Sequence, residues 1–488
     1  MKMCSPPFPD AEGSARKSLL TRAVSFVWRV GGTSRLRSEV GWVTFSCIAD
    51  LILTFISLKA CTMLLSKSAF GEYNLGMTAM VLLAYVFLFP MNQAYLRYFH
   101  TAEANGTARS AGLAVLTWYG VTTTMVAVIL MVATAPLSKT FGLELFVPLA
   151  VGLAFLASYW RWLGVEVLRI QRSRKMYSLQ SVSFQVLRAV FLVAAIYWVQ
   201  ASATWALLAH AAAAMLLAVF GIVPLARRIL SKPRGPRGDL MKMVWTFGIP
   251  SATVFVCLWI QAFADRYIVA YLLDFESVAV YVAAYQVCGV PYTMLATIMD
   301  NLVVPIAYQR TKDIKDARQV WAGGKAILIG AVAYVVIGAF GLLLYVVLGQ
   351  QLLVLLTTNK YLVSINVILV MTGCRYVQSL ATMLDRLFAV HHRMTRSFVF
   401  RAVGGGISLA LCWFGTKWFG FLGAVTGVFL GSLAYLVLAG VGPGGWVWLV
   451  WRNRKKLMDE SFACDSAESF PVTAVPNSSP SDEPPEVS

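Results

Sequence analysis

The sequence predicts an all-α, polytopic membrane protein with about 12 transmembrane helices arranged in two six-helix lobes. Hydrophobic residues make up 58% of the 488 residues, whereas only 13% are charged. A soluble domain carries roughly 25% charged residues, so the composition excludes an ordinary soluble protein. Two further observations support the prediction: the apolar residues form separate runs of membrane-spanning length, and Lys and Arg gather in alternate connections between them.

The apolar runs lie between Trp42 and Trp451, and each is close to the roughly 20 residues that a helix needs to cross a bilayer. The expected spans are 42–63, 76–96, 111–134, 143–162, 178–199, 203–225, 244–264, 278–304, 323–348, 362–384, 398–416 and 420–450. The last is long enough to tilt, or to end in an interfacial group of tryptophans.

The positions of the basic residues predict the orientation of the chain. With the N-terminus placed in the cytoplasm, the inner connections, such as 161–175, hold 33 of the 41 Lys and Arg residues, and the outer connections hold 5. Such an excess on one side follows the positive-inside rule. It predicts that both termini are cytoplasmic, and it explains the net charge of +18 without a nucleic-acid partner.

The chain divides into five segments. These are a basic cytoplasmic leader, 1–41; an N-terminal lobe, 42–226; a basic cytoplasmic linker, 227–243; a C-terminal lobe, 244–451; and a cytoplasmic tail, 452–488. The tail begins with a basic stop and continues as an acidic, Ser- and Pro-containing stretch, which predicts disorder. In the leader, apolar residues between positions 19 and 30 share one helical face, which is typical of a helix lying in the membrane surface; a leader without fixed structure is the alternative.

Metal, disulfide and catalytic sites are not expected. The eight cysteines stand singly, most of them inside apolar runs, and no Cys/His spacing typical of a metal site occurs. The four histidines offer little for catalysis. We therefore expect no cofactor and no catalytic residues.

Ionisable residues inside the spans are the main candidates for function, because each costs roughly 2.5–3.5 kcal/mol at a helix centre and seldom faces lipid. Ser181, Gln185 and Arg188 form one polar stripe in the fifth span. Either Arg188 meets a phosphate in a central cavity, or it pairs with an acid on a neighbouring helix.

The tenth span carries a similar stripe. Arg375, Gln378, Thr382 and Asp385 share one face, which suggests a water-lined surface; a buried network between helices is the alternative. Because Arg holds phosphate oxygens bidentately, we expect Arg188 and Arg375 to clamp a diphosphate from opposite lobes.

Asp50 lies in the first span among Ser46, Thr54 and Ser57. It is either an acid that couples transport to an ion or the partner of Arg188, and pairing is slightly favoured. The adjacent Asp265 and Arg266 are expected to close the seventh span near the outer surface, as a structural anchor or as a gate between lobes.

The stretch from Trp245 to Arg310 carries a recognisable pattern. It reads GIP at 248–250, DR at 265–266, VAVYVAAYQV at 278–287 and PIAYQR at 305–310. This pattern resembles the centre of the polysaccharide (O-antigen or exopolysaccharide) flippases of the multidrug/oligosaccharidyl-lipid/polysaccharide exporter superfamily. Over the rest of the chain the resemblance is one of architecture.

The resemblance implies a transporter of the bacterial inner membrane that flips isoprenoid-diphosphate-linked oligosaccharide repeat units by alternating access, for the synthesis of lipopolysaccharide or exopolysaccharide. The lipid-linked oligosaccharide, the membrane and polysaccharide polymerase or export proteins would be its partners. An ion-coupled multidrug or cation exporter of the same superfamily, with a cavity dominated by Asp50, is the alternative. A polymerase or glycosyltransferase would need a large outer loop, which this chain lacks, and a scaffold in a biosynthetic complex is a third option.

Overall fold

The computed structural model describes residues 34–170, 173–231, 240–311, 316–391, 393–442 and 444–452, which are helical almost throughout. The N-terminal half contains α2 (Ser34–Leu64), α3 (Lys67–Phe87), α4 (Phe89–Ala104), α5 (Ala108–Val132), α6 (Thr134–Phe141), α7 (Val147–Ile170), α8 (Arg174–Trp198) and α9 (Ala203–Ser231). The C-terminal half contains α10 (Leu240–Met243), η2 (Val244–Gly248), α11 (Ile249–Leu272), α12 (Phe275–Arg310), α13 (Ala317–Leu356), η3 (Asn359–Tyr361), α14 (Ile365–Leu384), α15 (Arg386–Val390) and α16 (Met394–Val441).

These helices confirm the predicted fold class. Ten of the described helical segments are long and apolar enough to cross a membrane. One of them, α16, reverses direction at Gly420, whose positive φ of 59° suits a residue without a Cβ, so it provides two crossings. The twelfth is α7, which has membrane-spanning length but carries Arg161 and Glu166.

The two arms of α16 pack closely because small residues line their contact. A Cβ on Gly423 would clash with the carbonyl of Gly415, and one on Gly427 would clash with that of Leu411. Glycines four residues apart let helix backbones approach in a membrane, where no hydrophobic force drives association.

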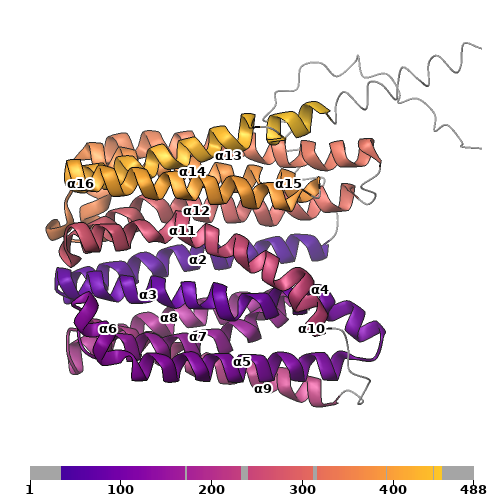
Figure 1. The fold of residues 1–488 in the computed structure, drawn as a ribbon, viewed down its shortest axis with the longest axis horizontal. Coiled ribbons are helices and arrows are strands. Elements are labelled where there is room, and N and C mark those ends of the chain that lie inside the picture. Colours follow the sequence, from indigo (N-terminus) through magenta and orange to yellow (C-terminus); the bar gives the residue numbers. More distant parts are fainter. Residues whose placement is uncertain are drawn as a thin grey trace, which may run out of the picture.

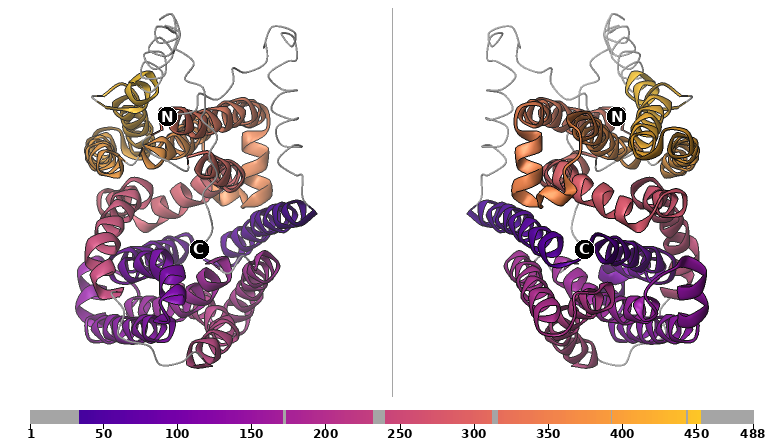
Figure 2. Two further views of the ribbon diagram at one scale, coloured as in Figure 1. Left: turned by 90° about the vertical axis from the view of Figure 1, so that its right-hand side faces the viewer. Right: turned by 90° about the vertical axis from the view of Figure 1, so that its left-hand side faces the viewer.

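The helices form two lobes. Figure 1 shows α3 and α5–α9 in the lower half of the molecule and α12–α16 in the upper half, and Figure 2 shows the two groups viewed along the helix axes. Within the N-terminal lobe, α7 packs against α9 and α2 against α8; within the C-terminal lobe, α12 packs against α13 and α14.

The lobes meet along α2 and α3 of one half and α11 and α12 of the other. Among the described residues, four hydrogen bonds cross this contact: Gln286 Nε2 donates to Asn74 Oδ1 over 3.3 Å, Trp259 Nε1 to the Thr78 carbonyl over 2.8 Å, Tyr267 to the Leu75 carbonyl over 2.9 Å, and the Thr78 hydroxyl to the Tyr267 hydroxyl over 3.1 Å. Lys59 of α2 donates to the carbonyls of Val354 (3.1 Å) and Thr357 at the end of α13.

Two crossing segments break at the same place. The second segment divides into α3 and α4 just before Pro90, and the seventh passes from α10 through the π-helical turn η2 into α11 at Gly248 and Pro250. A Cβ on Gly248 would clash with the Pro90 carbonyl, so the two breaks pack against each other. The helix therefore breaks where the sequence pattern GIP lies.

Several predicted boundaries are wrong. The second span was expected from residue 76, but α3 begins at Lys67 because Ser66 caps it by accepting a hydrogen bond from the Ala69 N–H over 3.2 Å. The fourth span, expected to end at residue 162, continues in α7 to Ile170. The first span is confirmed: α2 begins at Ser34, but its membrane-spanning part runs from Thr44 to Leu64, close to the expected 42–63. The leader helix expected near 19–30, the centre of the linker and almost all of the tail lie outside the described residues.

Candidate functional site

The predicted stripe of the fifth span lies on the inward face of α8. Val186, Val190 and Val193 are exposed on the other side of this helix, where lipid would surround it. Arg188 is half-buried and makes no hydrogen bond or ion pair with any described residue. An arginine inside a membrane span seldom stays without a partner, so this guanidinium is available to a ligand.

Asp50 lies in the same cluster but does not form the ion pair that the sequence slightly favoured. Its Oδ2 accepts a hydrogen bond from Ser181 over 2.9 Å, and its Oδ1 is buried without a partner. Asp50 interacts electrostatically with Arg188 and with Arg161 without direct contact to either. One carboxylate thus lies near two cations and neutralises neither by contact.

Arg161 is a functional candidate that the sequence analysis missed, since it was counted in the inner connection 161–175. The helix α7 continues to Ile170, so Arg161 lies well inside it and is only 8% exposed. Its guanidinium lies 3.8 Å from the ring centroid of Phe184 on α8. The apolar residues that continue beyond it, such as Leu163 and Val167, were the signal for a longer helix.

His210 of α9 completes this cluster. Its Nε2 lies 3.0 Å from the hydroxyl of Ser158 on α7, and its ring meets that of Phe184 edge-on with centroids 5.3 Å apart. Its Nδ1 is buried without a partner. The four helices α2, α7, α8 and α9 together surround a polar group with an excess of positive charge.

Arg375 of the C-terminal lobe has several neighbours as partners, although its Nε is buried without one. Its guanidinium donates to Oε1 of Gln378 and to the Thr293 hydroxyl, the latter over 3.2 Å. The contact with Gln378 agrees with the position of the two residues on one face of the helix. The guanidinium also lies 4.2 Å from the ring centroid of Tyr285. A Cβ at Gly289 would contact it at 2.8 Å, so a residue without a side chain makes room for it.

The pair Asp265–Arg266 does not open the outer turn. Both residues lie inside α11, which continues to Leu272 and is followed by a turn that Asp274 caps. Asp265 and Arg266 are 3% and 5% exposed; Tyr281 donates a hydrogen bond to Asp265, and Arg266 lies 4.9 Å from the ring centroid of Tyr285. These partners all belong to the C-terminal lobe and support a structural anchor.

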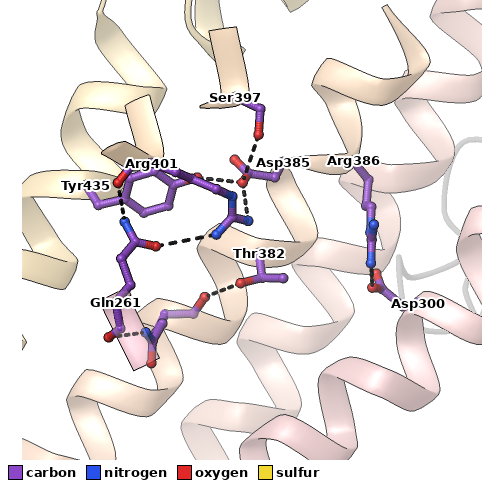
Figure 3. Close-up of polar contacts among 9 residues, drawn as sticks. Gln261, Asp300, Thr382, Asp385, Arg386, Ser397, Arg401 and Tyr435 are labelled. Atoms are coloured by element: carbon purple, nitrogen blue, oxygen red, sulfur yellow. Dashed lines mark hydrogen bonds and ion pairs between the residues drawn. The ribbon is translucent and has the colours of Figure 1, made fainter. Parts of the chain in front are cut away.

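The polar stripe of α14 ends in a buried network. Asp385 forms an ion pair with Arg401 and accepts a hydrogen bond from Tyr435 over 2.5 Å (Figure 3). Gln261 donates to the Arg401 carbonyl over 2.9 Å. Of the two interpretations of this stripe, the buried network is therefore correct at Asp385.

Figure 3 also shows Arg386 donating to Asp300, with distances of 3.1 and 2.7 Å to the same carboxylate oxygen. Each of Arg375, Arg386 and Arg401 thus has a partner in its own lobe. Among the residues that the structure describes, no hydrogen bond or ion pair joins Arg188 to Arg375, and no group of three His, Cys, Asp or Glu could hold a metal ion.

The fold is shared with solved transporters. An inward-facing multidrug-resistance MATE family transporter of the MOP superfamily superimposes with a TM-score of 0.64 at 15% identity, covering 90% of this chain and 99% of that chain. An outward-facing MATE transporter gives 0.64 at 14% identity, covering 86% and 96%. A variant of a Vibrio cholerae MATE transporter gives 0.59 at 12% identity, covering 90% and 98%.

Identities this low show the fold alone. A search of curated proteins finds no match. The model of the family described as "Polysaccharide biosynthesis protein" matches residues 36–309, which is more than half of the chain and includes the whole N-terminal cluster. The protein therefore belongs to the polysaccharide biosynthesis protein family and has the fold of the MOP-superfamily transporters.

Proposed function

We propose that this protein flips isoprenoid-diphosphate-linked oligosaccharide repeat units from the inner to the outer leaflet of the bacterial inner membrane, for surface polysaccharide synthesis. The observation that carries the proposal is Arg188, a cation within a membrane span that has no partner among the described residues. A diphosphate is the charged group of such a lipid, and guanidinium groups bind phosphate oxygens well.

The two-lobed architecture suits this cargo. The lobes contact each other through α2–α4 on one side and α10–α13 on the other, and rocking of two such lobes around a central site is the usual mechanism of transporters built in this way. The glycan requires a polar passage, while the lipid tail can stay in the bilayer. Membership of a polysaccharide biosynthesis family supports a glycan-linked substrate.

Deletion of the gene tests the proposal. We expect surface polysaccharide to disappear while lipid-linked repeat units accumulate on the cytoplasmic leaflet, measured by their resistance to a probe added from outside. The competing function is an ion-coupled drug exporter, which the similarity to MATE transporters favours. A deletion that changed only drug susceptibility would establish the exporter instead.

The orientation is part of the same proposal. The distribution of Lys and Arg supports a cytoplasmic location for both termini and for the linker 227–243. Reporter fusions after Arg237 and after Ala201 should report the inner and outer side, respectively. The opposite pattern would reverse the direction of transport that we propose.

A further inference from the structure

In the described part of the N-terminal lobe, Arg161 and Arg188 are guanidinium groups that no described carboxylate contacts. Arg161 and Arg188 interact with each other repulsively, and Asp50 is the acid that interacts with both. Neither arginine makes a hydrogen bond or ion pair to any residue in the described part of the chain. Two cations and one acid leave an excess positive charge inside the membrane span, which a bound anion would neutralise.

The side chains of this cluster converge on the ring of Phe184. Arg161 lies over it at 3.8 Å, and His210 meets its edge at 5.3 Å. Arg188 follows Phe184 by four residues, so it lies one turn farther along the same face of α8. The cluster therefore consists of Arg161 and His210, which are buried, and of Arg188, which is more exposed.

Several polar atoms of the cluster are buried without a hydrogen-bond partner. They are Arg161 Nε, His210 Nδ1, Gln185 Oε1 and Asp50 Oδ1. Arg161 Nε donates and His210 Nδ1 donates in one tautomer, so these two can serve an anion, whereas Gln185 Oε1 and Asp50 Oδ1 are acceptors and cannot. Buried polar atoms without partners seldom gather in one place unless a ligand uses some of them. An anion with several oxygens can accept from the arginine donors, and a diphosphate offers more acceptor oxygens than any single residue of the chain.

In the described part of the C-terminal lobe the arginines are held differently. Arg375 donates to Gln378 and Thr293 and lies against the face of Tyr285, although its Nε is buried without a partner, and Arg401 is neutralised by Asp385. A diphosphate at Arg375 would have to displace partners that are already in place. Two arginines that neither donate a side-chain hydrogen bond nor contact a carboxylate thus lie together in the described part of the N-terminal lobe, whereas Arg266, a C-terminal arginine with the same property, lies beside Asp265 and against the Tyr285 ring.

We propose that the diphosphate of the substrate binds wholly within the N-terminal lobe, between Arg161 and Arg188, with His210 and Gln185 as further polar contacts. This assignment rests on the proposed function and replaces the expected clamp between Arg188 and Arg375. It makes Arg161 a substrate-binding residue. The C-terminal lobe then moves relative to a diphosphate that stays on its partner lobe.

The test measures binding to the purified full-length protein in lipid nanodiscs by calorimetry. Farnesyl diphosphate and inorganic pyrophosphate are the probes, and farnesol is the uncharged control. We expect both diphosphates to bind and farnesol to bind at least tenfold more weakly. Binding of inorganic pyrophosphate alone would identify a soluble anion as the ligand and overturn the lipid assignment.

Variants of the arginines locate the diphosphate-binding site. Arg161→Gln and Arg188→Gln should each weaken the binding of farnesyl diphosphate by about tenfold or more, which is the factor expected for the loss of one charge-assisted hydrogen bond. Arg375→Gln is the matched control and should change the affinity for farnesyl diphosphate by less than about threefold. The reverse pattern, with loss only at Arg375, would overturn the proposal.

Two milder variants keep the test decisive if Arg161→Gln does not fold. Arg161→Lys keeps the positive charge but not the two parallel N–H donors of a guanidinium, so we expect an intermediate loss of affinity. Asp50→Asn removes the nearby negative charge and should tighten diphosphate binding by a few-fold; weaker binding would contradict an anion site here. If diphosphate binds the wild type and its affinity is unchanged in all these variants, the diphosphate site lies elsewhere and the flippase function stands. If no diphosphate binds the wild type, the function itself is contradicted.

Discussion

The two lobes differ in how the arginines within their helices are partnered. In the C-terminal lobe Arg401 pairs with Asp385, Arg386 pairs with Asp300, and Arg375 donates to Gln378. In the N-terminal lobe Arg161 and Arg188 have no hydrogen-bonding partner among the described residues. The lobes share a helical architecture, so the difference lies in the side chains and not in the fold.

This difference separates structure from function. A buried charge with a fitted partner holds helices together, and removal of one partner leaves the other uncompensated. A buried charge without a partner weakens the folded state, so its presence indicates a ligand or a moving ion. Arg401 therefore belongs to the first class, and Arg161 and Arg188 to the second.

The largest effect is expected for Arg401→Ala. It leaves the carboxylate of Asp385, which is 7% exposed, without its cation, and breaking a buried pair costs about 3–5 kcal/mol. Thermal unfolding of the purified protein should shift strongly downward. The double variant Arg401→Leu with Asp385→Leu should recover part of the loss, and a single variant as stable as the wild type would contradict a structural role.

Arg188→Gln should have the opposite profile. We expect the melting temperature to stay unchanged or to rise, because a cation without a partner is removed, while surface polysaccharide at matched protein levels falls about tenfold or more. Arg188→Lys should retain part of the transport, because lysine keeps the positive charge but not the two parallel N–H donors of the guanidinium.

A double variant with Asp50→Asn sharpens this result. Because Asp50 binds Ser181 and does not contact Arg188, adding Asp50→Asn to Arg188→Gln should not restore transport. Restored transport would show that Arg188 merely neutralises Asp50, and the comparison between the lobes would fail.

A smaller effect is expected for Arg375→Gln. Its contacts are to neutral groups, and each is worth about 1 kcal/mol. We expect a modest drop in melting temperature and a transport loss of a few-fold, well below that of Arg188→Gln. Equal losses for the two variants, measured as surface polysaccharide, would support a clamp shared by both lobes.

Much of this could be predicted from the sequence. Hydropathy and the spacing of apolar runs gave the twelve crossings, because each run must match the bilayer thickness. Helical periodicity placed Gln185 and Arg188 on one face, and it placed Gln378 within reach of Arg375. The break at Gly248 lies within the pattern GIP, where the approach of Pro90 excludes a side chain.

The pairing of charges could not be predicted, because it depends on which helices become neighbours. Asp385 contacts Arg401 of α16, and nothing in its own helix indicates that partner. Arg161 was missed because a charge near the end of an apolar run looks like the start of a loop, whereas α7 continues for nine more residues to Ile170. Helix ends are set by caps and tertiary packing as much as by composition.

The smallest effect concerns Lys59, a cation of the N-terminal lobe that does have partners, but in the other lobe. It donates to the Val354 and Thr357 carbonyls at the C-terminal end of α13, where a cation contributes about 0.3–1 kcal/mol. Lys59→Met should leave the lobes themselves as stable as before and weaken only the contact between them.

Spin labels at Tyr197 and Trp418, both exposed and one in each lobe, measure that contact in a background without native cysteines. Lys59→Met should shift the distance distribution toward longer separations, with a change in populations of about two- to fivefold. Lys360→Met is the matched control, because Lys360 is exposed beside the same helix end and should leave the distribution unchanged. An identical shift in both variants would mean that any positive charge near the C-terminal end of α13, and not the hydrogen bonds from Lys59, holds the lobes together.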